Sequence, residues 1–298
     1  MKPNLKIFLE LCQEKNIPCS IIHPSGNLVE VKSLSGEPYL FTIGTTPFNS
    51  HSMVTLCKDK EFFYDYYKGT VRMPRTRSFL TPFCSDEWRS HLEFPTIDAI
   101  VQETKKDFDF PCIVKMNKGS QGKCVFKAKN EDELKKSLDE IYKTDYIALV
   151  QDYINIQSEY RVIFLHQDLV FAYKKNNENA QFIGNLSPLH FKGAYAEIVE
   201  DEKLLQNFRN FTHSMFQRKD IPYCGLDITL DTDNKMWLIE ANTSPGFEYF
   251  LQNPQGKSLL RGLYTKMFIA LGVLPEKEKI VAKQSENAEN QNGNYLDY

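Results

Sequence analysis

The stretch from residue 225 to residue 241 constrains the fold more than any other part of this sequence. Two apolar runs, 225–230 and 236–241, flank the polar turn signal Asp231-Thr232-Asp233-Asn234. Polar turn residues between such runs predict an antiparallel hairpin. Centring the turn between Asp233 and Asn234 gives one wholly apolar face, made by the expected pairs Leu226/Ala241, Ile228/Ile239 and Leu230/Trp237.

The same register places two acidic residues directly opposite each other on the second face of the hairpin. These are Asp227 and Glu240, and Asn242 points the same way because it lies two residues further along. Like charges in that position destabilise a sheet. Two carboxylates and an amide oxygen are suited to Mg²⁺. A solvated face with two tolerated acids is the alternative, but the tight turn 243–246 follows at once, and its amides can face a phosphate.

Composition restricts the class of protein. The chain has 298 residues, 42% of them apolar, which suits one to three globular domains. Its 36 Lys and Arg against 39 Asp and Glu give no support for a nucleic-acid or membrane partner. The seven cysteines are scattered with no C-x-x-C pair, and the start resembles a charged helix, not a signal peptide. We therefore expect reduced thiols in a cytoplasmic protein.

The remaining pattern predicts an α+β fold. Apolar residues recur at helical spacing in 5–14, 62–67, 134–142 and 204–216, and Asn130 is placed to cap the third of these helices. Strand-like runs are expected at 19–23, 112–116, 124–126, 146–151, 160–165 and 169–173. Several hairpins, without regular alternation of strand and helix, favour α+β over a parallel sheet.

A lysine and a glycine-rich loop suggest an anionic ligand. Lys115 lies inside the apolar strand 112–116, where its ammonium is costly unless it meets an anion or reaches water at the strand end. The loop 118–123 follows, with glycines that let backbone amides fold over phosphates. It is not a Walker A loop, because Gly119 and Gly122 are too close and a strand comes next.

Taken in order, these pieces resemble the ATP-grasp superfamily of carboxylate–amine ligases from about Cys57 to Gly246. Cys57-Lys58-Asp59-Lys60 resembles its D-K element, and residues 110–115 resemble its F-P-x-V-x-K strand. The resemblance makes Lys60 and Lys115 the two nucleotide lysines. It also implies a phosphate-covering loop of Gly119, Ser120, Gln121 and Gly122, an adenine hinge of Gln151, Asp152, Tyr153 and Ile154, and a ribose contact at Glu159.

The resemblance also assigns residues that bind metal and residues that take part in catalysis. It implies that Asp227, Glu240 and Asn242 hold Mg²⁺, as two ions, with Mn²⁺ as an alternative. It assigns catalytic roles to Arg161, Lys192, Asn242 and Gly246. The segments 159–162 and 225–228 are most similar to RimK-type glutamate ligases and cyanophycin synthetases. D-alanine–D-alanine ligases are similar around 240–246, but they carry an arginine near the position of Gly225.

The resemblance implies an ATP-grasp fold, in which two α+β subdomains grip ATP after a short N-terminal α/β region. The expected divisions are 1–57, 58–148, 149–275 and a polar, disordered tail at 276–298. The implied activity is ATP- and Mg²⁺-dependent amide formation through an acyl phosphate, adding an amino acid such as glutamate to a peptide or protein. A small-molecule ligase of the D-alanine–D-alanine ligase kind and a catalytically silent nucleotide-binding module are the alternatives. Implied partners are ATP, a carboxylate and an amine (amino acid, peptide or protein), and a second copy of the chain, since similar enzymes are commonly oligomers.

Overall fold

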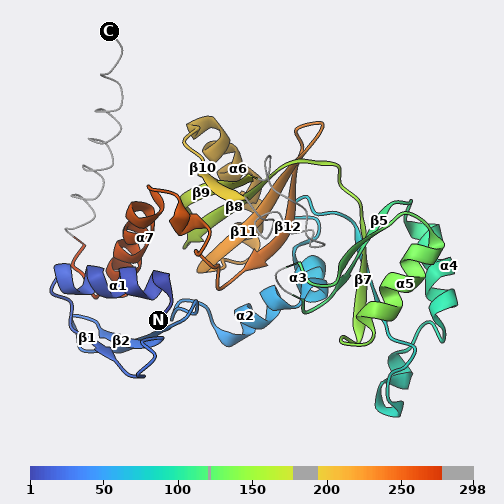
Figure 1. Cartoon of the computed structure of the whole chain (residues 1–298), viewed down its shortest axis with the longest axis horizontal. Helices are drawn as coiled ribbons and strands as arrows, with labels where there is room; N and C mark the ends of the chain where they lie inside the picture. Colours follow the sequence, from blue (N-terminus) through green and yellow to red (C-terminus); the bar gives the residue numbers. More distant parts are fainter. Residues whose placement is uncertain (120–121, 177–193, 277–298) are drawn as a thin grey trace, which may run out of the picture. The chain divides into compact units, whose positions relative to one another are not determined.

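The computed structural model describes residues 1–119, 122–176 and 194–276, and its strands form three antiparallel sheets (Figure 1). The chain divides into two compact units. One joins 1–48 to the segment that begins at Ser244, and the other is the continuous stretch 49–243. This mixed α+β architecture confirms the predicted fold class, whereas the expected boundaries after residues 57, 148 and 275 stay a prediction. Among the described helices, none has the length and apolarity needed to cross a bilayer.

The discontinuous unit has a small sheet of order β1-β2-β3. Its aromatic core brings together residues far apart in the sequence, because the ring of Phe8 lies 4.6 Å from that of Phe41 and 4.9 Å from that of Phe268. The elements of this unit are α1 (Pro3–Glu14), β1 (Cys19–Ile21), β2 (Leu28–Lys32), β3 (Pro38–Thr42), η3 (Phe250–Gln252) and α7 (Gly256–Ala270).

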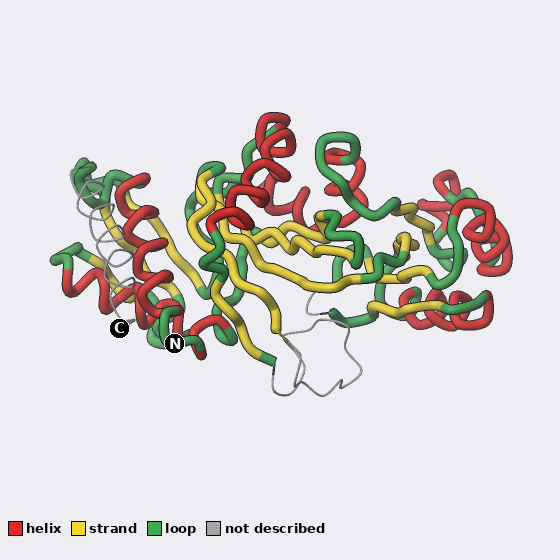
Figure 2. The backbone as a smooth tube through the Cα atoms, turned by 90° about the horizontal axis from the view of Figure 1, so that it is seen from above, coloured by secondary structure: helices red, strands yellow, loops and turns green. Residues whose placement is uncertain are grey.

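The continuous unit contains a central sheet of order β10-β9-β8-β11-β12, whose strands run side by side in Figure 2. Its core-facing side packs on α6, where Phe208, Met215 and Phe216 meet apolar residues of the strands. Two hairpins predicted from the sequence form its middle. The elements are α2 (His51–Lys58), α3 (Lys60–Tyr67), β8 (Ile156–Leu165), β9 (Asp168–Asn176), β10 (Tyr195–Ile198), α6 (Glu202–Arg218), β11 (Tyr223–Asp231) and β12 (Met236–Asn242).

A second, four-stranded sheet of the same unit has the order β4-β7-β5-β6. Helices α4 and α5 bury Ile100, Leu134 and Leu138 against it. The predicted cap of α5 is confirmed, since Asn130 Oδ1 accepts a hydrogen bond of 2.9 Å from the Glu133 amide. The elements are β4 (Thr76–Leu80), η1 (Asp86–His91), α4 (Ile97–Asp107), β5 (Cys112–Met116), β6 (Val125–Ala128), α5 (Glu131–Ile141) and β7 (Ile147–Asp152).

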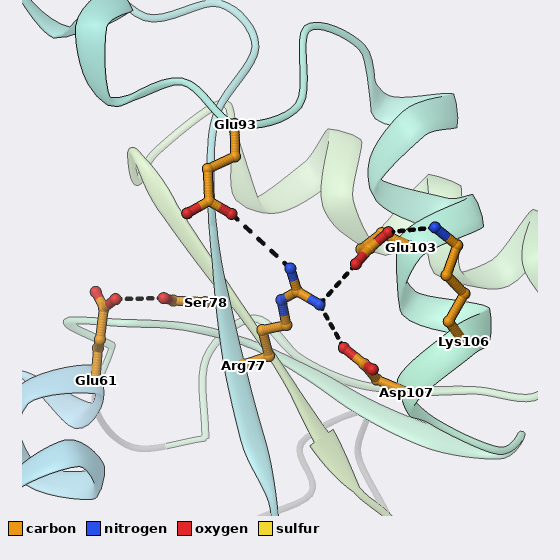
Figure 3. Close-up of polar contacts among 7 residues, drawn as sticks. All are labelled: Glu61, Arg77, Ser78, Glu93, Glu103, Lys106 and Asp107. Atoms are coloured by element: carbon orange, nitrogen blue, oxygen red, sulfur yellow. Dashed lines mark hydrogen bonds and ion pairs between the residues drawn. The ribbon is translucent and has the colours of Figure 1, made fainter.

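Arg77 of β4 holds the segments around it together, as Figure 3 shows. Its guanidinium is 3.0 Å from Glu103 and 3.8 Å from Glu93, and it also donates to Asp107. Glu103 in turn accepts from Lys106 at 2.8 Å. Because these carboxylates come from α4 and from the segment before it, one half-buried cation ties both to the strand.

The two ends of the continuous unit meet beside the start of β11. The Asn49 side chain donates to the Tyr223 carbonyl at 2.7 Å and accepts from the Tyr223 amide at 3.1 Å. Two residues further along β11, Gly225 pairs with Asn242, the last residue of β12. The chain therefore enters and leaves this unit at neighbouring points.

The register of the β11–β12 hairpin agrees with the prediction on one side of a β-bulge and departs from it on the other. The pairs Leu226/Ala241 and Asp227/Glu240 are confirmed. Beyond the bulge, Ile228 pairs with Leu238, not Ile239, and Leu230 pairs with Met236, not Trp237. The expected pairs were wrong because Leu238 and Ile239 are both apolar, so the pattern fits either register. As a result Leu238 enters the core and is fully buried.

Candidate active site

The candidate site begins with a row of charged residues across three strands. Asp227 of β11 is paired with Glu240 of β12 on one side and with Arg161 of β8 on the other. The Arg161 guanidinium binds the Asp227 carboxylate through two donors: Nε donates to Oδ1, and Nη2 donates to Oδ2 at 2.8 Å. The arginine therefore offsets the repulsion that two facing carboxylates would otherwise cause.

Lys175 of β9, which was not predicted from the sequence, adds a second cation beside Asp227. Its Nζ lies 2.9 Å from Asp227 Oδ2 and also donates to Glu159. The strand was expected to end at Tyr173, but β9 continues to Asn176. In the structure β9 pairs Lys174 with Tyr160, and one further step along both strands brings Lys175 beside Glu159.

We call these four residues, Glu159, Arg161, Lys175 and Asp227, the ionic quartet. Their side chains are at most 16% exposed, and their two positive and two negative charges balance. Burial alone would raise the pKa of Asp227, but the charges of Arg161 and Lys175 bring that pKa well below its usual range. Asp227 is therefore a carboxylate at every pH at which the protein would work.

Two lysines face the site from the four-stranded sheet and from α3. Lys115 is buried, and its Nζ donates to Gln151 Oε1 at 3.0 Å, while Gln151 Nε2 donates to Thr76 Oγ1 at 2.8 Å. Burial lowers the pKa of Lys115 to about 8. Lys60 donates to the carbonyls of Asn117 and Gly119, at 3.2 and 2.6 Å, and burial lowers its pKa as well.

These groups line one narrow cavity between the central and the four-stranded sheets. It is lined by Lys60, Lys115, Gln151 and Glu240, and by Ile239, which the bulge turns toward it. The cavity measures about 10 Å³, which is room for about one water molecule.

Of the other residues expected at the site, those that the structure describes do not line this cavity. Asp152 pairs with Arg75 at 3.1 Å, Tyr153 lies under the Lys127 ammonium at 3.7 Å, and Ile154 is half-buried in the connector to β8. Gly122 has a positive φ of 68°. Gly246 belongs to the other unit. Ser120, Gln121, Lys192 and most of the predicted tail (277–298) lie outside the described residues.

The donor set for a metal ion is chemically suitable. Asp227, Glu240 and Asn242 offer hard oxygen donors of the kind that Mg²⁺ prefers, from neighbouring positions of one hairpin. Within the described residues, however, no three His, Cys, Asp or Glu side chains come together around a common point. The Asp227 carboxylate is turned toward Arg161 and Lys175.

Comparison with known proteins agrees with this geometry. The chain matches the RimK-like ATP-grasp domain over residues 93–255, which is more than half of its length. It therefore belongs to the RimK-like ATP-grasp family, and the resemblance seen in the sequence is confirmed.

Individual relatives show how far the similarity extends. The chain is 31% identical over 150 residues to the uncharacterized protein MG012 homolog of Mycoplasma pneumoniae, covering 50% of this chain and 48% of that protein. It is 26% identical to a D-alanine–D-alanine ligase of Staphylococcus haemolyticus, covering 52% and 45%. The chain thus spans about half the length of the curated relatives it matches.

A solved structure supports the fold. The D-alanine–D-alanine ligase of Bacillus anthracis superposes with a TM-score of 0.54 at 17% identity, over 80% of this chain and 72% of that one. At this identity the likeness concerns the fold alone.

Proposed function

We propose that this chain is an ATP- and Mg²⁺-dependent ligase that joins a carboxylate to an amine. The observation that carries the proposal is the cavity that the buried Lys115, the half-buried Lys60 and Glu240 line together. Buried cations of this kind are costly unless they meet an anion. Beside them lies a hard-oxygen set for a divalent cation. Both features suit a nucleoside triphosphate with its metal ion.

In the proposed reaction, a substrate carboxylate oxygen attacks the γ-phosphorus of ATP, and the bond to the β-phosphate oxygen breaks, releasing ADP. An amine nitrogen then attacks the acyl phosphate, phosphate leaves, and the amine loses a proton to give the amide. The first step brings two anions together, so it needs concentrated positive charge. When bound, Mg²⁺ would screen the phosphate charges from Asp227, Glu240 and Asn242.

We propose the remaining roles from the resemblance to the ATP-grasp superfamily. Lys60 and Lys115 would bind the phosphates, and Arg161 would hold the transferring group. The loop at 119–122 would cover the phosphates and exclude water from the acyl phosphate. The remaining proposed contacts are Gln151, Asp152, Tyr153 and Ile154 for adenine, Glu159 for ribose, Lys192 for a phosphate, and Asn242 and Gly246 for the reacting groups.

The substrates we propose are an amino acid, glutamate among the first to test, and an amino acid, peptide or protein that receives it. Membership of the RimK-like family supports this substrate class. Similarity to proteins named D-alanine–D-alanine ligase supports a small-molecule dipeptide as the second candidate. Both candidates share the same ATP chemistry, so product mass distinguishes them.

The test is ADP formation with pools of amino acids and peptides, followed by mass detection of the product. We expect ADP release only when a carboxylate and an amine are both present. Glu240→Gln should reduce that release at least 100-fold. Asp233→Asn is the matched control, because Asp233 lies in the turn of the same hairpin and is exposed. Full activity in Glu240→Gln would contradict the proposal, and ATP binding without ADP release for any pair would indicate a silent module.

A further inference from the structure

The two facing carboxylates of the β11–β12 hairpin are in different states. Among the described residues, the side chains that donate to Asp227 are cationic: Arg161 reaches both of its oxygens, and Lys175 reaches Oδ2 at 2.9 Å. Glu240, directly opposite, makes no hydrogen bond or ion pair with any residue that the structure describes. The Asp227 carboxylate is therefore bound by two cations, whereas the Glu240 carboxylate has no such partner among the described residues.

A divalent cation that approaches Asp227 in this arrangement meets two positive charges already at its oxygens. It must displace Lys175 or Arg161 from the carboxylate, and either displacement leaves a buried cation without its partner. The displaced charge would then need another anion. The triphosphate that Lys60 and Lys115 are proposed to bind would supply one.

We propose that the ionic quartet keeps Asp227 closed to metal in the nucleotide-free protein, and that the metal position there opens only when a triphosphate attracts Arg161 and Lys175. This inference rests on the proposed function for the identity of the anion. It makes metal and nucleotide binding mutually dependent, because two ligands that favour the same rearrangement strengthen each other equally. Lys175 acts as a positioning residue in this scheme, since its position determines where the metal carboxylate points.

The test measures metal binding without turnover, with Mn²⁺ as the probe and its electron paramagnetic resonance signal as the readout. Lys175→Met alone leaves two carboxylates facing one arginine, so the principal variant is the double change Lys175→Met with Glu159→Gln. This pair keeps the quartet electrically neutral. Lys174→Met is the matched control, because Lys174 neighbours Lys175 on β9 and points to the opposite face of the sheet.

We expect the nucleotide-free double variant to bind Mn²⁺ at least tenfold more tightly than the wild type. The gain should disappear when Asp227→Asn is added, and Lys174→Met should match the wild type. Equal Mn²⁺ affinity in a folded double variant and the wild type would overturn the inference, as would a gain that survives Asp227→Asn.

A second measurement uses the wild-type chain alone and so does not depend on any variant folding. A non-hydrolysable ATP analogue is titrated into protein with and without Mn²⁺, and Mn²⁺ binding is measured with and without the analogue. At least tenfold mutual strengthening, beyond that of the free Mn²⁺–analogue complex, supports the inference, and independent binding refutes it. Failure of the ligase proposal would look different: no ADP would form with any substrate pair, while the Mn²⁺ result in the double variant would stand.

Discussion

Nucleotide binding should draw a proton onto Lys115. Burial lowers the pKa of this lysine to about 8 in the free protein, so near pH 8 the ammonium is only about half protonated. A bound triphosphate would raise that pKa again, because an adjacent anion favours the charged form. Binding should therefore take up about 0.1 proton at pH 7, about 0.5 at pH 8 and about 0.9 at pH 9, from the pKa of about 8.

The assay is calorimetric titration of a non-hydrolysable ATP analogue with Mg²⁺, repeated in buffers of different ionisation enthalpy at each pH. The slope of the observed heat against the buffer enthalpy gives the number of protons taken up. Lys115→Arg is the control, since a guanidinium stays protonated throughout this range and should abolish most of the uptake. Any uptake that remains reports on Lys60, whose pKa burial also lowers.

Two results would refute the reasoning. Uptake that does not rise between pH 7 and pH 9 would mean that Lys115 is already fully charged before the nucleotide binds. Equal uptake in wild type and Lys115→Arg would mean that the proton goes to another group. In either case the buried lysine would not be the group whose charge the nucleotide restores.

Three further predictions concern the fold. Leu238→Ala should lower the free energy of unfolding by about 2–5 kcal/mol, measured by urea denaturation, because Leu238 is fully buried. Ile239→Ala should weaken ATP binding, because Ile239 lines the cavity, and it should lower the free energy of unfolding less than Leu238→Ala does. A larger loss of stability from Ile239→Ala than from Leu238→Ala would contradict the position of the β-bulge. Arg77→Met should lower the melting temperature, and salt should partly restore it by screening the carboxylates left behind. Arg89→Met, at an exposed pair, should leave it unchanged, and equal effects would contradict the role of Arg77.

Parts of the site could be read from the sequence because they depend on short-range geometry. The facing of Asp227 and Glu240 required only strand alternation and a recognisable turn, and it is confirmed. The strand containing Lys115 was bounded by proline and polar residues, and β5 has the expected limits. In both cases a few neighbouring residues decide the structure.

Other parts depended on choices that neighbouring residues leave open. The β-bulge could not be predicted, because consecutive Leu238 and Ile239 satisfy the apolar pattern in either register. Lys175 was missed because a pair of lysines after Tyr173 looks like the polar end of a strand. It is buried there because Glu159 and Asp227 come from two other strands, and that arrangement exists only once the sheet is assembled.

The two hydrogen bonds between Asn49 and Tyr223 bring the ends of the stretch 49–243 close together. Because residues 49 and 243 lie at the same end of β11, the stretch between them starts and finishes at one place. Segments with neighbouring ends are well suited to excision, transplantation and circular permutation. The stretch 49–243 should thus be suited to excision and transplantation as one unit. Sequence added before it or after it is attached at a single point, so different flanking regions can be exchanged without rebuilding the strands that carry Asp227 and Glu240.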